Sequence, residues 1–253
     1  MNKSVLALIA GTGLAATTWS AHAIPLLQLD IGGGSYDTST QTTVTSADAF
    51  SLYAYLTPSN SCDALCAASL LGTQYYVSVA LAPQTSASGN YGSFSYNTGA
   101  ATTVVNATSD MTYGRPPLEG TLATSDPGDL APHGIYDTYF YEIPFYFASA
   151  NTACVVNVQD NAGAGPNTSC AGMYYATFNL DKSGLSDGFD LHFDLYNENM
   201  RNNGDVDINN FAPFSHDAAT TTTKVPEPET LALFGLGLVS MSLVSTLRRR
   251  AKK

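Results

Sequence analysis

The amino-acid sequence predicts an all-β domain over residues 24–214, an antiparallel β-sandwich of the jelly-roll kind. Short segments rich in aromatic and β-branched residues are separated by clusters of Gly, Pro, Ser, Asn and Asp, a pattern typical of strands joined by turns. No segment between residues 24 and 225 keeps an apolar period of 3.6 through three helical turns. A length of about 200 residues suffices for one domain with a substantial core.

Five segments carry the strand prediction: residues 50–56, 75–82, 136–147, 174–180 and 189–196. The last of them shows the clearest period of two. One alternating set of its side chains is expected in the core, namely Phe189, Leu191, Phe193 and Leu195. The other set is expected to meet water, namely Asp190, His192, Asp194 and Tyr196.

Polar intervals separate these strands. Residues 84–103, rich in Ser, Thr, Gly and Asn, and the proline-rich residues 114–134 are predicted to be surface loops. Residues 215–224 include four consecutive threonines and are predicted to be a flexible stalk. Residues 31–35 are rich in glycine, but neither the lysine nor the helix of a phosphate-binding loop follows them, so a tight turn is expected there.

The amino-terminal residues 1–23 have the composition of a signal peptide. Lys3 precedes an apolar stretch over residues 5–16, and residues 21–23 form a small-x-small cleavage site. The mature chain is therefore expected to begin at Ile24. The alternative is an uncleaved amino-terminal anchor, for which the apolar stretch is short.

The carboxyl-terminal residues 225–253 have the order of a motif, a membrane span and a basic stop. Uncharged residues 230–247 would form about 27 Å of helix, close to the hydrocarbon thickness of a bilayer. Basic residues follow the span and are expected to stay in the cytoplasm, which leaves residues 24–225 outside. The motif is Val225, Pro226, Glu227 and Pro228, and the stop is Arg248, Arg249 and Arg250.

These three parts together resemble a PEP-CTERM sorting signal. The resemblance implies processing near residues 226–228 by exosortase, a membrane-embedded cysteine peptidase of Gram-negative bacteria that make exopolysaccharide. In addition, four segments resemble the choice-of-anchor N proteins, a family that implies no particular activity. They are residues 25–29, 35–37, 132–136 and 211–217.

The charge of the exported part excludes one class of partner. Residues 24–225 hold 19 acidic residues and four basic ones, a formal net charge of −15. Such a surface repels phosphate backbones and offers few cations for counterion release, so a nucleic-acid partner is not expected. Divalent cations are more natural partners.

All four cysteines lie in the exported part, where disulfides form. Four cysteines allow three pairings. We favour Cys62 with Cys66 and Cys154 with Cys170, because each pair brackets a turn-rich segment and needs no long-range closure. Zinc ligation is the weaker alternative, since no histidine lies beside these cysteines.

Two segments are candidate metal sites. Asp205, Asp207 and Asn209 present side-chain oxygens at every second residue, as calcium loops do. The pattern is not an EF-hand, because Asn210 stands where Gly is expected and His216 where a bidentate Glu is expected; the alternative is an Asn/Asp-rich turn. The second candidate is Asp190, His192 and Asp194 on one strand face, with a solvated acidic face as the alternative.

No motif predicts catalysis. The sequence has no Gly-x-Ser-x-Gly elbow. Ser215, His216 and Asp217 look like a triad on paper, but sequence neighbours are not expected to point at one another, so a polar turn is predicted there. A pair of carboxylates for glycoside cleavage stays open, because sequence spacing does not give distance in space.

The sequence therefore predicts a non-enzymatic protein that passes through an anchored stage in the inner membrane before it reaches the cell surface or the extracellular matrix. Its expected role is structural or interactive, in the envelope, exopolysaccharide or biofilm. One alternative is a carbohydrate-binding module that recognises the cell's own exopolysaccharide through exposed tyrosines, with or without calcium. The other is a secreted glycan-active hydrolase.

Overall fold

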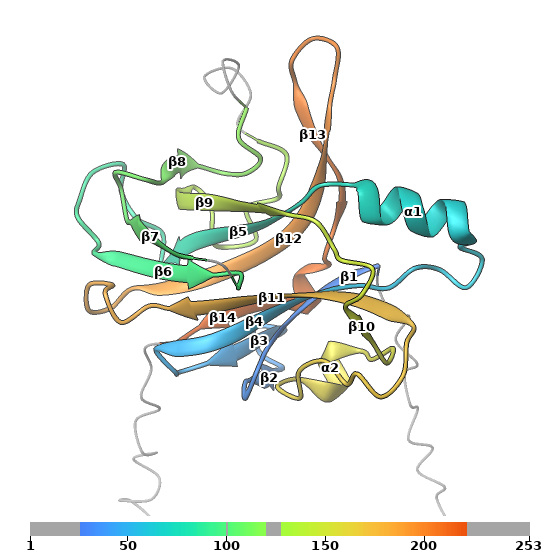
Figure 1. Ribbon diagram of the computed structural model, residues 1–253. Helices are drawn as coiled ribbons and strands as arrows, with labels where there is room; N and C mark the ends of the chain where they lie inside the picture. Colours follow the sequence, from blue (N-terminus) through green and yellow to red (C-terminus); the bar gives the residue numbers. More distant parts are fainter. Residues whose placement is uncertain (1–25, 100, 120–127, 222–253) are drawn as a thin grey trace, which may run out of the picture.

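The computed structural model describes residues 26–99, 101–119 and 128–221 (Figure 1). The predicted signal peptide, the sorting motif at residues 225–228, the span at 230–247 and Arg248 to Arg250 lie outside these residues. Within the described ranges, no helix has the length and apolar character needed to cross a membrane.

The described residues form two β-sheets. The first has the order β1-β4-β11-β6-β7, with β10 paired to β11. Its strands are β1 Leu27–Ile31, β4 Ala49–Leu56, β6 Ser93–Asn97, β7 Thr102–Asn106, β10 Thr152–Ala153 and β11 Met173–Asp181. The second has the order β2-β3-β14-β12-β5-β9-β8, with β13 paired to β12. Its strands are β2 Ser35–Asp37, β3 Thr42–Thr45, β5 Tyr75–Ala82, β8 Thr112–Gly114, β9 Thr138–Phe145, β12 Asp190–Met200, β13 Val206–Phe211 and β14 Asp217–Thr220.

The main core lies between the two sheets. Leu52 and Phe178 of the first sheet and Val79 of the second belong to one cluster of buried apolar side chains. Across the gap, the rings of Phe50 and Phe193 meet edge to face with centroids 5.9 Å apart. The all-β prediction is therefore confirmed. One parallel pair, β3 with β14, joins otherwise antiparallel described strands, and the jelly-roll topology stays a prediction.

Each of the five predicted strand segments overlaps a strand, namely β4, β5, β9, β11 and β12. Two predicted loops are partly wrong. Residues 84–103 contain β6 and the start of β7, because Ser, Thr and Asn fit half-exposed positions of a pleated sheet. The stalk over residues 215–224 is wrong for β14, whose Ala218 and Ala219 pair with both β3 and β12.

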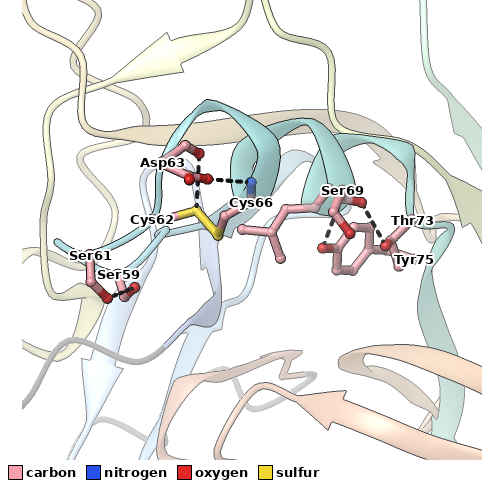
Figure 2. Close-up of a disulfide and its surroundings, with 9 residues drawn as sticks. Ser59, Ser61, Cys62, Asp63, Cys66, Ser69, Thr73 and Tyr75 are labelled. Carbon is pink, nitrogen blue, oxygen red and sulfur yellow. Dashed lines mark hydrogen bonds between the residues drawn. A yellow bond between two sulfur atoms is a disulfide. The ribbon is translucent and has the colours of Figure 1, made fainter.

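A helix that the sequence pattern did not predict follows the first disulfide. Asp63 caps α1, Ala64–Gly72, by accepting a hydrogen bond from the Cys66 backbone N–H at 2.9 Å. The Cys62–Cys66 disulfide links the residue before this cap to the first turn (Figure 2). At the other end, the Tyr75 hydroxyl donates to the Leu70 carbonyl at 3.2 Å. The helix is short and carries no fully buried residue, so it leaves little periodic signal in the sequence.

The second disulfide, Cys154–Cys170, encloses the short helix α2, Val158–Asn161, and the loop after it. Both cysteine pairs agree with the predicted pairing. The loop is fixed to the first sheet by Asp30, whose carboxylate accepts from the Gly163 and Gly165 backbone N–H groups at 2.8 and 3.2 Å. The Gly33 N–H donates to the Gly163 carbonyl in turn, within the tight turn expected after β1.

The outer face of the second sheet is covered as well. Residues 128–137, together with the 3-10 helix η2, Phe214–His216, lie over β5, β9 and β12. A smaller apolar cluster forms there from Ala80, Leu130, Tyr136 and Phe140. His192, Asp194 and Tyr196 were predicted to meet water, but they are 4 %, 3 % and 0 % exposed. The prediction failed because the covering segments lie far away in the sequence from β12.

Candidate metal centre

Four polar side chains converge beneath this cover. His192 and Asp194 point to the same side of β12, because residues two apart on a strand share a face. β14 pairs with β12 so that Ala218 lies opposite Phe193, and this register brings Asp217 beside Asp194. His133 reaches the same point from the loop before β9.

The ligand atoms of these four residues all lie within 4.8 Å of one another. The two histidine Nε2 atoms are 3.1 Å apart. Asp194 Oδ1 lies 3.3 Å from His133 Nε2 and 3.5 Å from His192 Nε2. Asp217 Oδ2 lies 3.8 Å and 3.5 Å from the same two nitrogens. Each carboxylate thus faces both imidazoles.

Surrounding groups hold these side chains in place. Tyr136 donates its hydroxyl hydrogen to Asp194 Oδ2 at 2.6 Å and lies 3.0 Å from the Ser78 hydroxyl. Burial, followed by the Asp194 charge, raises the pKa of Tyr136 well above its ordinary value, so this hydroxyl stays a donor. His133 Nδ1 lies 2.6 Å from the Ala131 carbonyl, and its ring stacks on Phe214 with centroids 4.1 Å apart.

Burial sets the electrostatics of the cluster. Burial lowers the pKa of His133 and therefore favours its neutral imidazole. Burial also opposes the charge of His192, but the Asp194 and Asp217 carboxylates outweigh it and raise the pKa of His192 to about 10. Burial, reinforced by the charge of Asp194, raises the pKa of Asp217 to about 8. Without a further cation, His192 is the main positive charge facing the two acids.

A cavity of about 450 Å³ reaches the cluster from outside. Its lining includes His133, His192 and Asp217, together with apolar and hydroxyl side chains such as Val44 and Thr42. Three of the four converging residues therefore border a space that a small ion can traverse.

The predicted calcium loop has a different environment. Arg201 donates a hydrogen bond from Nε to Asp207 Oδ2, and the same Nε lies 3.6 Å from Asp205 Oδ2. A guanidinium thus supplies positive charge beside two of the three candidate ligands. Asn209 follows on β13, and calcium binding at this loop stays a prediction.

Two other predicted groupings are rearranged. Asp190 does not join His192 and Asp194 but pairs with Lys182 Nζ at 3.1 Å. The expectation that Ser215 and His216 do not meet is wrong, because Ser215 Oγ and His216 Nδ1 are 2.9 Å apart.

On its other side His216 contacts Asn157, whose Oδ1 lies 3.0 Å from His216 Nε2. Ser215, His216 and Asn157 thus form a hydrogen-bonded row, whereas Asp217 faces His133, His192 and Asp194. The row joins η2 to the residue that caps α2, which accounts for it as a structural link.

Comparison with known proteins identifies the carboxyl-terminal region. Residues 224–250 match the family model of the PEP-CTERM protein-sorting motif. The chain carries a PEP-CTERM sorting motif. No curated protein and no solved structure matches the chain. The PEP-CTERM resemblance is thereby confirmed, whereas the resemblance to choice-of-anchor N proteins stays a prediction.

The sequence pattern placed His192 and Asp194 together but did not indicate His133 and Asp217. His133 lies in residues 132–136 and Asp217 in residues 211–217, and neither segment has a periodic pattern that ties it to β12. The fold brings these distant segments to one point.

Proposed function

We propose that this protein is an exported, exosortase-processed component of the cell surface or extracellular matrix, and that its β-sandwich acts by interaction without catalysing a reaction. The sorting motif at residues 224–250 carries the proposal. Such a motif implies export, an intermediate anchored in the inner membrane, and processing by exosortase.

The body of the protein supports an extracellular setting. All four cysteines are paired in two disulfides, and disulfides persist in oxidising compartments outside the cytoplasm. The net charge of −15 over residues 24–225 favours solubility and disfavours nucleic-acid partners.

Two observations support a non-enzymatic role. The described residues contain no free cysteine to act as a nucleophile. The Ser215–His216 pair uses both imidazole nitrogens in fixed contacts, one to Ser215 and the other to Asn157, and Ser215 is not among the residues that line the cavity at the His/Asp cluster.

The partner that we propose is the cell's own exopolysaccharide. Tyrosine rings are natural platforms for sugars, and Tyr146 and Tyr113 are 57 % and 39 % exposed. Much of the aromatic segment at residues 136–147 serves packing instead, since Tyr136, Tyr139 and Phe140 are buried.

Fractionation and mass spectrometry of the protein from exosortase-bearing cells test the sorting. The parent is expected at the surface or in the medium with its carboxyl terminus near residues 226–228, whereas a Pro226→Ala, Glu227→Ala variant should stay full-length in the membrane. Glu229→Ala is the matched control and should be processed normally. Recovery of the parent from cytosol, with reduced thiols and an intact leader, would overturn the proposal.

Isolated exopolysaccharide tests the role of the body. We expect the protein to bind it in a pull-down and to release no sugar products on long incubation. Release of sugar products by the purified protein would contradict the non-enzymatic part, and absence of binding would contradict the proposed partner.

A further inference from the structure

We propose that His133, His192, Asp194 and Asp217 bind one divalent transition-metal ion of the zinc class. This metal site goes beyond the sorting and interaction roles and does not depend on them.

The geometry of the four ligand atoms fits such an ion. A tetrahedral zinc ion with bonds of about 2.0–2.2 Å places its ligand atoms about 3.3–3.6 Å apart. The five nitrogen–nitrogen and nitrogen–oxygen separations in the cluster are 3.1, 3.3, 3.5, 3.5 and 3.8 Å. The remaining separation, between the two carboxylate oxygens, is within 4.8 Å. One ion at the centre can therefore reach all four atoms with small side-chain adjustments.

The donor atoms favour a transition metal over calcium or magnesium. Two imidazole nitrogens and two carboxylate oxygens form a mixed set that suits zinc and its first-row neighbours. Calcium and magnesium prefer oxygen ligands alone. Because His133 Nδ1 lies 2.6 Å from a carbonyl oxygen, it must carry the hydrogen as donor, which leaves Nε2 of the neutral ring with its lone pair toward the cluster.

The buried carboxylates point to a missing cation. Asp194 Oδ1, the oxygen that faces both imidazoles, is buried without a hydrogen-bond partner among the described residues, and so is Asp217 Oδ1, beside the oxygen that faces them. Leaving a buried polar oxygen without a partner is costly. A divalent ion between two carboxylates and two neutral imidazoles gives a site with no net charge.

The surroundings have the features of a prepared metal site. Tyr136 orients Asp194 through the oxygen that does not face the histidines, and Phe214 supports the His133 ring from one side. His133 adopts a backbone φ of 30°, an uncommon conformation for a residue other than glycine. The surrounding contacts hold this conformation, which presents the imidazole to the sheet.

The position of the ion suggests what it does. His133 belongs to the loop that covers the outer face of the second sheet, whereas the other three ligands belong to β12 and β14. One ion would therefore fasten the covering loop to two adjacent strands. Four protein ligands fill a tetrahedral shell, which is the pattern of structural zinc sites, and the cavity at the cluster gives the ion a route in.

Metal analysis of the full-length chain tests this inference. The protein, exported in a bacterial host and purified in detergent without a metal-binding tag, would be stripped with a chelator and dialysed against zinc. We expect one zinc per chain by elemental mass spectrometry and a melting temperature several degrees above that of the stripped protein. Cobalt in place of zinc should give the intense visible absorption of a tetrahedral ion. A folded protein that retains no zinc would overturn the proposal.

Variants then locate the ion. His133→Ala removes the loop ligand, which is the member of the cluster least committed to the sheet, and should weaken zinc binding by at least about 100-fold. Asp217→Asn should do the same. The matched control is Asp205→Asn, which removes a carboxylate from the predicted calcium loop and should leave zinc affinity unchanged.

The pattern of losses decides between sites. Unchanged zinc affinity in folded His133→Ala protein would contradict the proposal, as would a loss of zinc in the Asp205→Asn control. If Asp217→Asn fails to fold, the titrated parent and His133→Ala still decide the question. Excess calcium should not displace zinc; displacement would show that the site is a hard-cation site instead.

Discussion

The two faces of β12 are both buried, yet they are buried in different ways. On the inner face, Leu191, Phe193 and Leu195 enter the apolar core between the sheets. On the outer face, His192, Asp194 and Tyr196 lie beneath a loop. His192 faces Asp194, Asp194 accepts from the Tyr136 hydroxyl, and Tyr196 donates to Glu142. Apolar burial requires only volume, whereas polar burial requires a partner for each group. The outer face therefore restricts more closely which residues can pack against it.

The largest effect is expected on the inner face, from Phe193→Ala. The ring is fully buried and meets Phe50 edge to face, so its loss should lower the free energy of unfolding by about 3–5 kcal/mol. Urea unfolding of the variant and the parent measures it. Leu65→Ala, at a residue 81 % exposed, is the control and should change stability little. A loss below about 1 kcal/mol at Phe193 would mean that the inner face is not the main core.

A pH-dependent effect is expected on the outer face, from Glu142→Gln. Glu142 accepts a hydrogen bond from the Tyr196 hydroxyl, and burial, together with the charges of Glu198 and Glu119, raises the pKa of Glu142 to about 7. In the unfolded chain this pKa returns to its ordinary value of 4.5. The folded state therefore holds the proton more tightly, and the stability that Glu142 contributes below pH 4.5 is lost as the pH rises through 7.

The expected result is that the stability of the parent falls relative to that of Glu142→Gln by up to about 3 kcal/mol between pH 4.5 and pH 7.5. Urea unfolding of both proteins across this range measures the difference, which cancels the other groups that titrate in both. Parallel curves for the two proteins would show that Glu142 ionises normally in the fold.

A smaller effect on the same face is expected from Tyr136→Phe. The change leaves the shape of the ring but deprives Asp194 Oδ2 of its donor, which should cost about 1–3 kcal/mol in unfolding free energy. It should also weaken zinc binding by about 10–100-fold, as loss of a group that orients a ligand does. Tyr146→Phe, at an exposed tyrosine, is the matched control. Equal effects of the two changes would remove the distinction between a buried polar contact and an exposed hydroxyl.

The smallest effect is expected where the outer face opens to solvent, from Asp207→Asn. The ion pair of Asp207 with Arg201 is exposed, since the Arg201 side chain is 58 % accessible, and exposed pairs contribute little. We expect the melting temperature to change by less than about 2 °C. The same assay with calcium tests the predicted calcium loop: a calcium-dependent rise in melting temperature that Asp207→Asn abolishes would establish it.

The sequence predicted those parts of the fold that depend on local pattern. Period-two alternation identified the inner face of β12, and the spacing of Cys62 and Cys66 identified a local disulfide. It did not predict the burial of His192 and Asp194, because their cover comes from a loop about 60 residues away in the chain.

The candidate metal centre was predicted only in part for the same reason. Residues two apart on one strand can be recognised from one segment, so His192 and Asp194 were paired correctly. His133 and Asp217 join them only through the loop before β9 and the pairing of β14 with β12, and neither arrangement leaves a periodic trace. The spacing of Asp205 and Asp207 likewise gave no sign of Arg201, whose guanidinium lies beside both carboxylates.

The position of β14 has a mechanical consequence for a protein that ends in a sorting motif. β14 lies between β3 and β12, and the Thr221 N–H still donates to the Thr45 carbonyl beyond its last residue. Tension on the chain after Thr221 would pull along a strand held on both sides and load its hydrogen bonds in shear, so the domain would resist being peeled open from that end.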